Sequence, residues 1–99
     1  MEARIEVKDE VIRKIILEGH CSGYSKGTNS KLCFAVSTLV NTICGLDGDG
    51  VSVVDYGHFV YEPTTPRNFA YIEYLITCLT TIASQFPLAI EFKLIKKEN

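Results

Sequence analysis

Apolar residues along this chain occur in short runs and, between the runs, at the spacing of an amphipathic helix. Two runs rich in Ile and Val, residues 4–7 and 11–17, flank a short charged segment and predict a β-hairpin. From about Lys31 to Leu46, apolar side chains recur every three or four residues, which predicts a helix. The first half of the chain is therefore expected to fold as two strands followed by a helix.

The second half repeats this order and adds one strand. Residues 51–54 and 59–61 predict another hairpin, and a second helix begins at Pro66 and is stopped by Pro87. Residues 88–95 then alternate between apolar and charged side chains, which is typical of a strand. The order ββαββαβ predicts a single α+β domain over the whole chain, with two helices packed on one face of a mostly antiparallel sheet.

A polar segment separates the first hairpin from the first predicted helix. Residues 22–30 are rich in Gly, Ser, Thr and Asn, which is typical of a loop, and this loop is long for so small a domain. Ser30, at its end, is predicted to cap the helix with its hydroxyl. Because such loops often carry function, the residues at its two ends are candidates for a site.

Charge and composition narrow the possible functions. The net charge is −2 and the basic residues form no stripe, so direct binding of nucleic acid is not expected. The charged N-terminus lacks a long apolar run, so we expect no secretory signal and no membrane anchor, and we predict a cytoplasmic protein. Hydrophobic residues make up 46% of the 99 residues, enough for a core, although so small a domain can gain stability by dimerising.

Four cysteines are present, Cys21, Cys33, Cys44 and Cys78, and none belongs to a C-x-x-C pair. This spacing predicts neither a zinc site nor a thioredoxin-type redox motif, and without an export signal the thiols are expected to stay reduced. Cys44 and Cys78 lie among apolar residues of the predicted helices, so we expect them in the core. His20, Cys21 and Cys33 would give three metal ligands at best, so no metal or other cofactor is expected.

Cys33 and His20 are the candidate catalytic residues. With Ser30 as the cap, Cys33 lies in the first helical turn, where free amides and the helix dipole stabilise a thiolate and could receive an oxyanion. His20 ends the second strand, and the loop is long enough to bring its imidazole to the thiol as general base and acid. From the residues alone, a buried structural cysteine and a surface histidine are the alternatives.

Three neighbours could support this pair. Ser37 follows Cys33 by one helical turn, so it either orients the site or packs the helix against the sheet. Gly19 is expected to let the chain turn so that His20 faces the helix. Cys21 could form a disulfide with Cys33 under oxidation, which would block the nucleophile.

Two short motifs surround these residues. Gly19-His20 is followed by a Gly/Ser loop that contains Tyr24, and then by Leu32-Cys33-Phe34-Ala35-Val36-Ser37. Together with the length and the order of elements, these motifs resemble the bacterial ribosomal-processing cysteine protease (Prp) family, over nearly the whole chain. Members carry a Gly-His at the end of the second strand and a Cys-small-Ala-Val-Ser run that opens the first helix.

The resemblance implies a cysteine endopeptidase with Cys33 as nucleophile and His20 as general base. Similar proteins remove a short N-terminal extension from the large-subunit ribosomal protein numbered twenty-seven, and they cut after an aromatic pair. They are homodimers with a mobile loop over the site, which corresponds to residues 21–30 here. The precursor of that ribosomal protein is therefore the expected substrate, and a second copy of the chain is the expected partner.

The chain departs from the family pattern near the site. Cys21 stands where many members have Ala, Ser30 where many have Asp, and Phe34 where a small residue is usual. Ser can replace Asp as a cap, but an Asp that tuned the catalytic pair would be lost. The alternatives to a protease are a non-catalytic, ribosome-associated module that binds the same peptide, and a thiol redox or metal protein.

Overall fold

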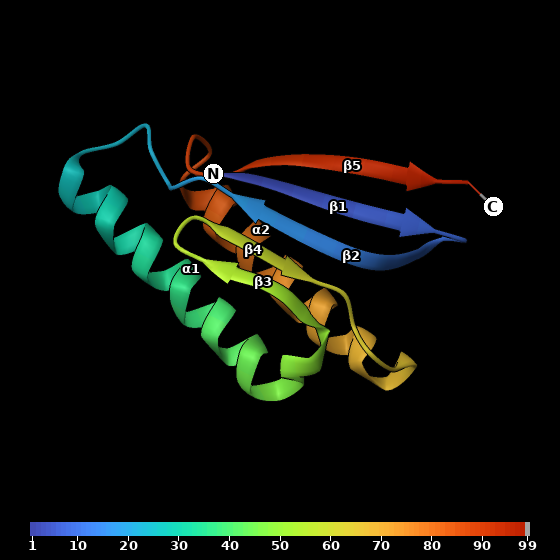
Figure 1. Ribbon diagram of the computed structural model, residues 1–99. Coiled ribbons are helices and arrows are strands. Elements are labelled where there is room, and N and C mark those ends of the chain that lie inside the picture. Colours follow the sequence, from blue (N-terminus) through green and yellow to red (C-terminus); the bar gives the residue numbers. More distant parts are fainter. Residues whose placement is uncertain (99) are drawn as a thin grey trace.

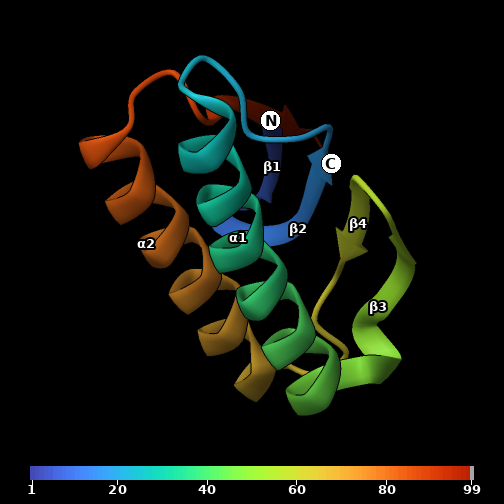
Figure 2. The ribbon, with the colours of Figure 1, turned by 90° about the vertical axis from the view of Figure 1, so that its left-hand side faces the viewer.

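The fold is a five-stranded sheet with two helices on one face, as the computed structural model of residues 1–98 shows (Figure 1). The strands lie in the order β3-β4-β2-β1-β5, and their bounds are β1 (Glu2–Lys8), β2 (Val11–Glu18), β3 (Val51–Asp55), β4 (His58–Tyr61) and β5 (Glu91–Lys97). Every neighbouring pair is antiparallel except β1 and β5, which are parallel. The helices α1 (Lys26–Asp47) and α2 (Phe69–Gln85) lie side by side over the same face (Figure 2). The predicted α+β class and the ββαββαβ order are confirmed; residue 99 of the predicted domain lies outside the described range.

The hydrophobic core lies between the sheet and the two helices. Its largest fully buried side chains come from β2, β4 and both helices: Ile15, Ile43, Tyr61, Ile72, Leu75 and Leu79. Burying an aliphatic side chain of this size contributes about 1.5–3 kcal/mol to folding. Because side chains alternate along a strand, the charged residues of β1 lie on the opposite face of the sheet, where ion pairs join the strands: Glu2–Lys93, Arg4–Glu18 and Glu6–Lys97.

The first helix begins earlier than predicted, and this corrects the prediction of its cap. α1 starts at Lys26, and Ser25 is the N-cap, whose side chain accepts a hydrogen bond from the Thr28 amide at 3.2 Å. Asn29 adds a second local contact, since its side chain bonds both the amide and the carbonyl of Tyr24. Ser30 is therefore an exposed residue inside the helix. The Gly, Ser and Asn content that predicted a loop is offset by these capping contacts.

The C-terminal elements also differ in detail from the prediction. Pro66 opens a 3-10 turn, Pro66–Asn68, and the α-helix follows at Phe69. The last strand begins at Glu91, so the predicted strand start at residue 88 is three residues too early. Within residues 1–98, no helix is both long and apolar enough to cross a membrane.

The last strand leaves apolar side chains uncovered. Phe92 and Leu94 pair with Ala3 and Ile5, so they point to the side of the sheet that the helices cover. Nevertheless Leu94 is 62% exposed and Phe92 is 37% exposed, whereas Ala3 is fully buried. The helices therefore cover β1 but not β5, which lies at the edge of the sheet (Figure 1).

Candidate active site

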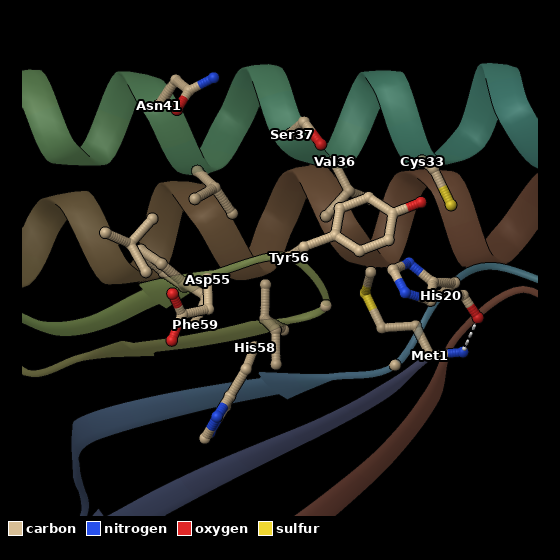
Figure 3. Close-up of a pocket in the computed structure, with 15 residues that line it drawn as sticks. Met1, His20, Cys33, Val36, Ser37, Asn41, Asp55, Tyr56, His58 and Phe59 are labelled. Carbon is tan, nitrogen blue, oxygen red and sulfur yellow. Dashed lines mark hydrogen bonds between the residues drawn. The ribbon is translucent and has the colours of Figure 1, made fainter.

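A cleft runs between α1 and the turn that joins β3 to β4. Its more enclosed cavity, about 220 Å³, is lined on the helix side by Cys33, Val36, Ser37, Val40 and Asn41, and on the opposite side by His20 and the hairpin residues 54–59. A second, shallower cavity adjoins it and shares His20, Cys33 and Tyr56. The two candidate catalytic residues therefore border the same cleft from opposite sides (Figure 3).

The backbone around His20 is held by contacts from two directions. Gly19 has a φ of +84°, a conformation that glycine adopts without strain, and its amide donates to the Gly57 carbonyl at 2.8 Å. The His20 carbonyl accepts a hydrogen bond from the ammonium group of Met1 at 2.9 Å (Figure 3). The turn expected at Gly19 is thus present, and the exposed imidazole projects from a fixed backbone into the cleft.

Tyr56, which the sequence did not single out, contacts this imidazole. The Tyr56 and His20 ring centroids lie 4.4 Å apart, with the planes tilted by 41°. The neighbouring Gly57 leaves room for the ring, because a Cβ at that position would lie 2.9 Å from His20 Nε2. Antiparallel pairing of β2 with β4 sets Glu18 opposite His58, which carries the hairpin turn to the end of β2. The contact therefore depends on the long-range pairing of β2 with β4, and no local pattern in the sequence predicts it.

Cys33 lies deeper in its helix than predicted. It is the eighth residue of α1, beyond the first turn, so the amides around it are engaged in intrahelical hydrogen bonds. The predicted stabilisation of the thiolate by a helix N-terminus is therefore wrong. Instead, the backbone amide of Cys21 donates a hydrogen bond to Cys33 Sγ at 3.3 Å. A donor of this kind favours negative charge on the sulfur.

Cys33 and His20 face each other across the cleft without direct contact. The half-buried Cys33 thiol points from α1 toward the part of the cleft that holds His20 (Figure 3). Within residues 1–98, no hydrogen bond joins the imidazole to the thiol. The arrangement brings a base and a nucleophile to one cavity, and a change of side-chain torsions is needed to bring them together.

The Cys21 thiol lies beside the same sulfur. Burial, together with the nearby Cys33 thiol, raises the pKa of Cys21 to about 11. Its side chain is only 4% exposed, so Cys21 is a protonated, buried neighbour of the candidate nucleophile at neutral pH. In the described part of the chain, no three His, Cys, Asp or Glu side chains are grouped so that they could hold a metal ion.

The remaining predicted residues are spread over the cleft and the helices. Ser37 lines the more enclosed cavity one turn after Cys33, and Ser30 lines the second cavity as an exposed helical residue. Cys44 is half-buried and packs against the core. Cys78, which was expected in the core, is half-buried in a groove between the outer sides of α1 and α2, so that prediction holds only in part.

Comparison with solved structures gives the same fold for proteins of distant sequence. The crystal structure of an essential ribosomal processing protease, Prp, from S. aureus with a covalently linked product peptide matches 97% of this chain and 98% of its own, with a TM-score of 0.70 and 24% identity. The same protease with a substrate peptide matches 94% of this chain and 97% of its own, with a TM-score of 0.70 and 22% identity. SMU.848 from Streptococcus mutans matches 97% of this chain and 94% of its own, with a TM-score of 0.65 and 21% identity.

This chain has the fold of the Prp protease. No protein-family model matches the chain. No curated protein sequence matches it significantly. The likeness covers nearly the whole of each chain, so it extends to both sides of the cleft.

Proposed function

We propose that this protein is a cysteine endopeptidase that removes the N-terminal extension of the bacterial large-subunit ribosomal protein numbered twenty-seven, in the cytoplasm. One observation carries the proposal: Cys33 and His20 border one cleft in a fold shared with a ribosomal processing protease that was crystallised with substrate and product peptides. The motifs around both residues resemble that family as well.

In the proposed reaction, His20 takes the proton of Cys33, and the resulting thiolate attacks the carbonyl carbon of the scissile peptide bond. The protonated imidazole then gives its proton to the leaving amine, and an acyl-enzyme remains on the sulfur. Water, deprotonated by His20, attacks the thioester; the C–S bond breaks, the Cys33 thiolate leaves, and the new C-terminus is released as a carboxylic acid that ionises in water. The Cys21 amide, which lies beside the sulfur, favours the thiolate before attack.

The gap between imidazole and thiol is compatible with this role. Catalytic hydrogen bonds are often long before substrate binds and tighten in the complex. The His20 side chain is exposed and its backbone is fixed, so rotation about its side-chain torsions is the movement available. Peptide binding in the cleft would exclude water and favour the closed pair.

The lining of the cleft supports a peptide with apolar side chains as the substrate. Val36 and Val40 of α1 face Val54 and Phe59 of the hairpin, and Leu17 also lines the cavity. An apolar side chain next to the scissile bond would be desolvated there, which places its carbonyl near Cys33. An aromatic pair before the cut is the substrate feature that the resemblance implies.

We also propose that the protein is a homodimer formed through β5. Edge strands offer unpaired backbone groups, and β5 adds the exposed apolar side chains of Phe92 and Leu94. Antiparallel pairing of two copies centred on Leu94 would set Glu91 of one copy opposite Lys97 of the other. The sheet would then continue through the two-fold axis.

The deciding experiment incubates purified protein with the N-terminally extended ribosomal protein and measures the masses of the products. Cys33→Ala is the test variant, and Cys78→Ala, which removes a thiol outside the cleft, is the matched control. A single cut by the wild type and Cys78→Ala, absent with Cys33→Ala, would establish the activity and the nucleophile. Binding of the precursor with no cut by any of them would favour the non-catalytic module.

A further inference from the structure

Two thiols meet at one end of the cleft. The Cys21 amide lies 3.3 Å from Cys33 Sγ. Because an N–Cα bond is about 1.5 Å long, the Cys21 Cα lies no more than about 4.8 Å from that sulfur. The effect of the Cys33 thiol on the Cys21 pKa also places the two side chains next to each other.

We propose that a peroxide converts Cys21 and Cys33 into an intramolecular disulfide that reversibly blocks the Cys33 nucleophile. The regulatory consequence rests on the proposed protease function, whereas the disulfide itself depends only on the position of the two thiols. This pairing is specific to a chain with cysteine directly after His20.

The two sulfurs differ in access, and this sets the order of the chemistry. Cys33 is half-buried and lines both cavities, whereas Cys21 is 4% exposed, so the oxidant meets Cys33 first. The Cys33 thiolate attacks one peroxide oxygen, and with one proton taken up this gives a sulfenic acid and one water. The Cys21 thiolate then attacks the sulfenic sulfur, and the hydroxyl group leaves as a second water. In sum, two thiols and one hydrogen peroxide give one disulfide and two waters.

The attack of Cys21 on the Cys33 sulfenic acid should be slow at neutral pH and faster at alkaline pH. Burial, the main cause of the raised Cys21 pKa, persists during the reaction, so few Cys21 thiolates are present at neutral pH. The contribution of the Cys33 charge disappears once Cys33 has become a neutral sulfenic acid. We therefore expect disulfide formation to accelerate as the pH rises from 7 toward about 9.

The backbone at Cys21 can adjust to the bond. β2 ends at Glu18 and α1 starts at Lys26, so the residues between them belong to neither element. Cys33 is fixed in the helix, and movement of the short Cys21 segment would bring the sulfurs to bonding distance. The other two cysteines lie elsewhere on the helices, where Cys78 provides a control.

The test treats the reduced, purified protein with one equivalent of hydrogen peroxide and measures the intact mass, the free thiols and the linked peptides. We expect the mass to fall by two hydrogens, the free thiols to fall from four to two, and a linked peptide pair that contains Cys21 and Cys33. Dithiothreitol should reverse all three changes. Cys78→Ala should form the same link.

In Cys21→Ala the link cannot form, so with at least two equivalents of hydrogen peroxide, given to wild type and variant alike, Cys33 should instead gain two oxygens as sulfinic acid, which dithiothreitol does not reverse. Cys21→Ser serves as a second variant if the alanine protein does not fold. A wild type that gives no Cys21–Cys33 link, or whose Cys33 reaches sulfinic acid as fast as in Cys21→Ala, would overturn the proposal.

Activity is measured separately, with each protein compared with its own reduced form. Wild-type cleavage should be lost with the disulfide and restored by reductant, whereas the loss in Cys21→Ala should be permanent. If the reduced wild type cuts no precursor while the disulfide forms as described, the proposed protease function fails and the disulfide stands. Full cleavage by the disulfide-linked protein would overturn the regulatory part.

Discussion

The phenol ring of Tyr56 lies against the imidazole of His20, with ring centroids 4.4 Å apart. Tyr56 is 95% exposed, so burial does not account for its position, and the contact with His20 is its only ring contact in the described structure. A tilted aromatic pair of this kind contributes about 0.5–1.5 kcal/mol. That is enough to favour one orientation of an otherwise exposed imidazole.

We therefore expect Tyr56→Ala to slow the reaction of Cys33 while the protein stays folded. The rate of Cys33 alkylation by iodoacetamide should fall about tenfold, because a misplaced imidazole no longer takes the thiol proton efficiently. Tyr56→Phe keeps the ring and should retain the wild-type rate. The free energy of unfolding should fall by no more than about 1.5 kcal/mol in Tyr56→Ala and should change by less than about 0.5 kcal/mol in Tyr56→Phe. An unchanged or faster alkylation rate in Tyr56→Ala would contradict the positioning role.

The cap of α1 gives a second prediction, on stability. Ser25→Ala removes the hydrogen bond to the Thr28 amide and should lower the free energy of unfolding by about 1 kcal/mol. Ser30→Ala is the matched control, since this exposed helical residue should change stability by less than about 0.5 kcal/mol. Urea denaturation of both proteins measures the difference. A larger loss of unfolding free energy from Ser30→Ala than from Ser25→Ala would indicate that Ser30 is the cap, as predicted from the sequence.

A buried carboxylate joins the end of α1 to the end of β4. Asp47 is 6% exposed and accepts hydrogen bonds from the Tyr61 hydroxyl at 2.9 Å and the Thr64 hydroxyl at 2.8 Å. Burial alone would raise the pKa of Asp47, but the hydrogen bonds from Thr64 and Tyr61 outweigh it and lower the pKa. Burial, with Asp47 next to the phenol, raises the pKa of Tyr61.

These pKa shifts determine how the stability of the fold changes with pH. Asp47 contributes its full stabilisation above the unfolded pKa of about 3.9 and loses it as the pH falls through the lower folded pKa. Tyr61 destabilises the fold above about pH 10, where the unfolded phenol ionises and the folded one does not. Asp47→Ala should cost about 1–3 kcal/mol at neutral pH and weaken the acid dependence. Asp49→Ala, at an exposed position, should change neither the stability at neutral pH nor its acid dependence. Thermal unfolding at several pH values measures both variants, and equal effects would contradict the stabilising role of Asp47.

The proposed dimer gives a fourth prediction. Leu94→Lys should raise the dimer dissociation constant about tenfold or more, because it places a charge at the centre of the β5 contact. Tyr74→Lys, on the exposed side of α2, is a control of similar exposure and should leave the dimer intact. Light scattering over a dilution series measures both. Loss of the dimer in Tyr74→Lys alone would contradict the β5 interface and would indicate that α2 forms it.

The sequence predicted the order of elements because each element has its own local pattern of apolar residues. The predicted start of the first helix was wrong because side-chain contacts of Ser25 and Asn29 stabilise a helical conformation in a Gly- and Ser-rich segment. The prediction that His20 and Cys33 lie at one site agrees with the cleft, but the predicted cap at Ser30 gave the wrong reason for a reactive thiol. Tyr56 could not be predicted, since it reaches His20 only through the pairing of β2 with β4.

The parallel pairing of β1 with β5 has a consequence for how the chain is made. β1 leaves the ribosome before the other described strands and β5 after them, so one edge of β1 stays open until β5 has been made. Met1, which borders the cleft, also accepts a backbone hydrogen bond from Glu91 at 2.8 Å. Contacts between such distant parts of a chain form late in folding. The Met1 side of the cleft is therefore not held in place until β5 has emerged, so a protein proposed to act on ribosomal substrates would become competent only after β5 has been made.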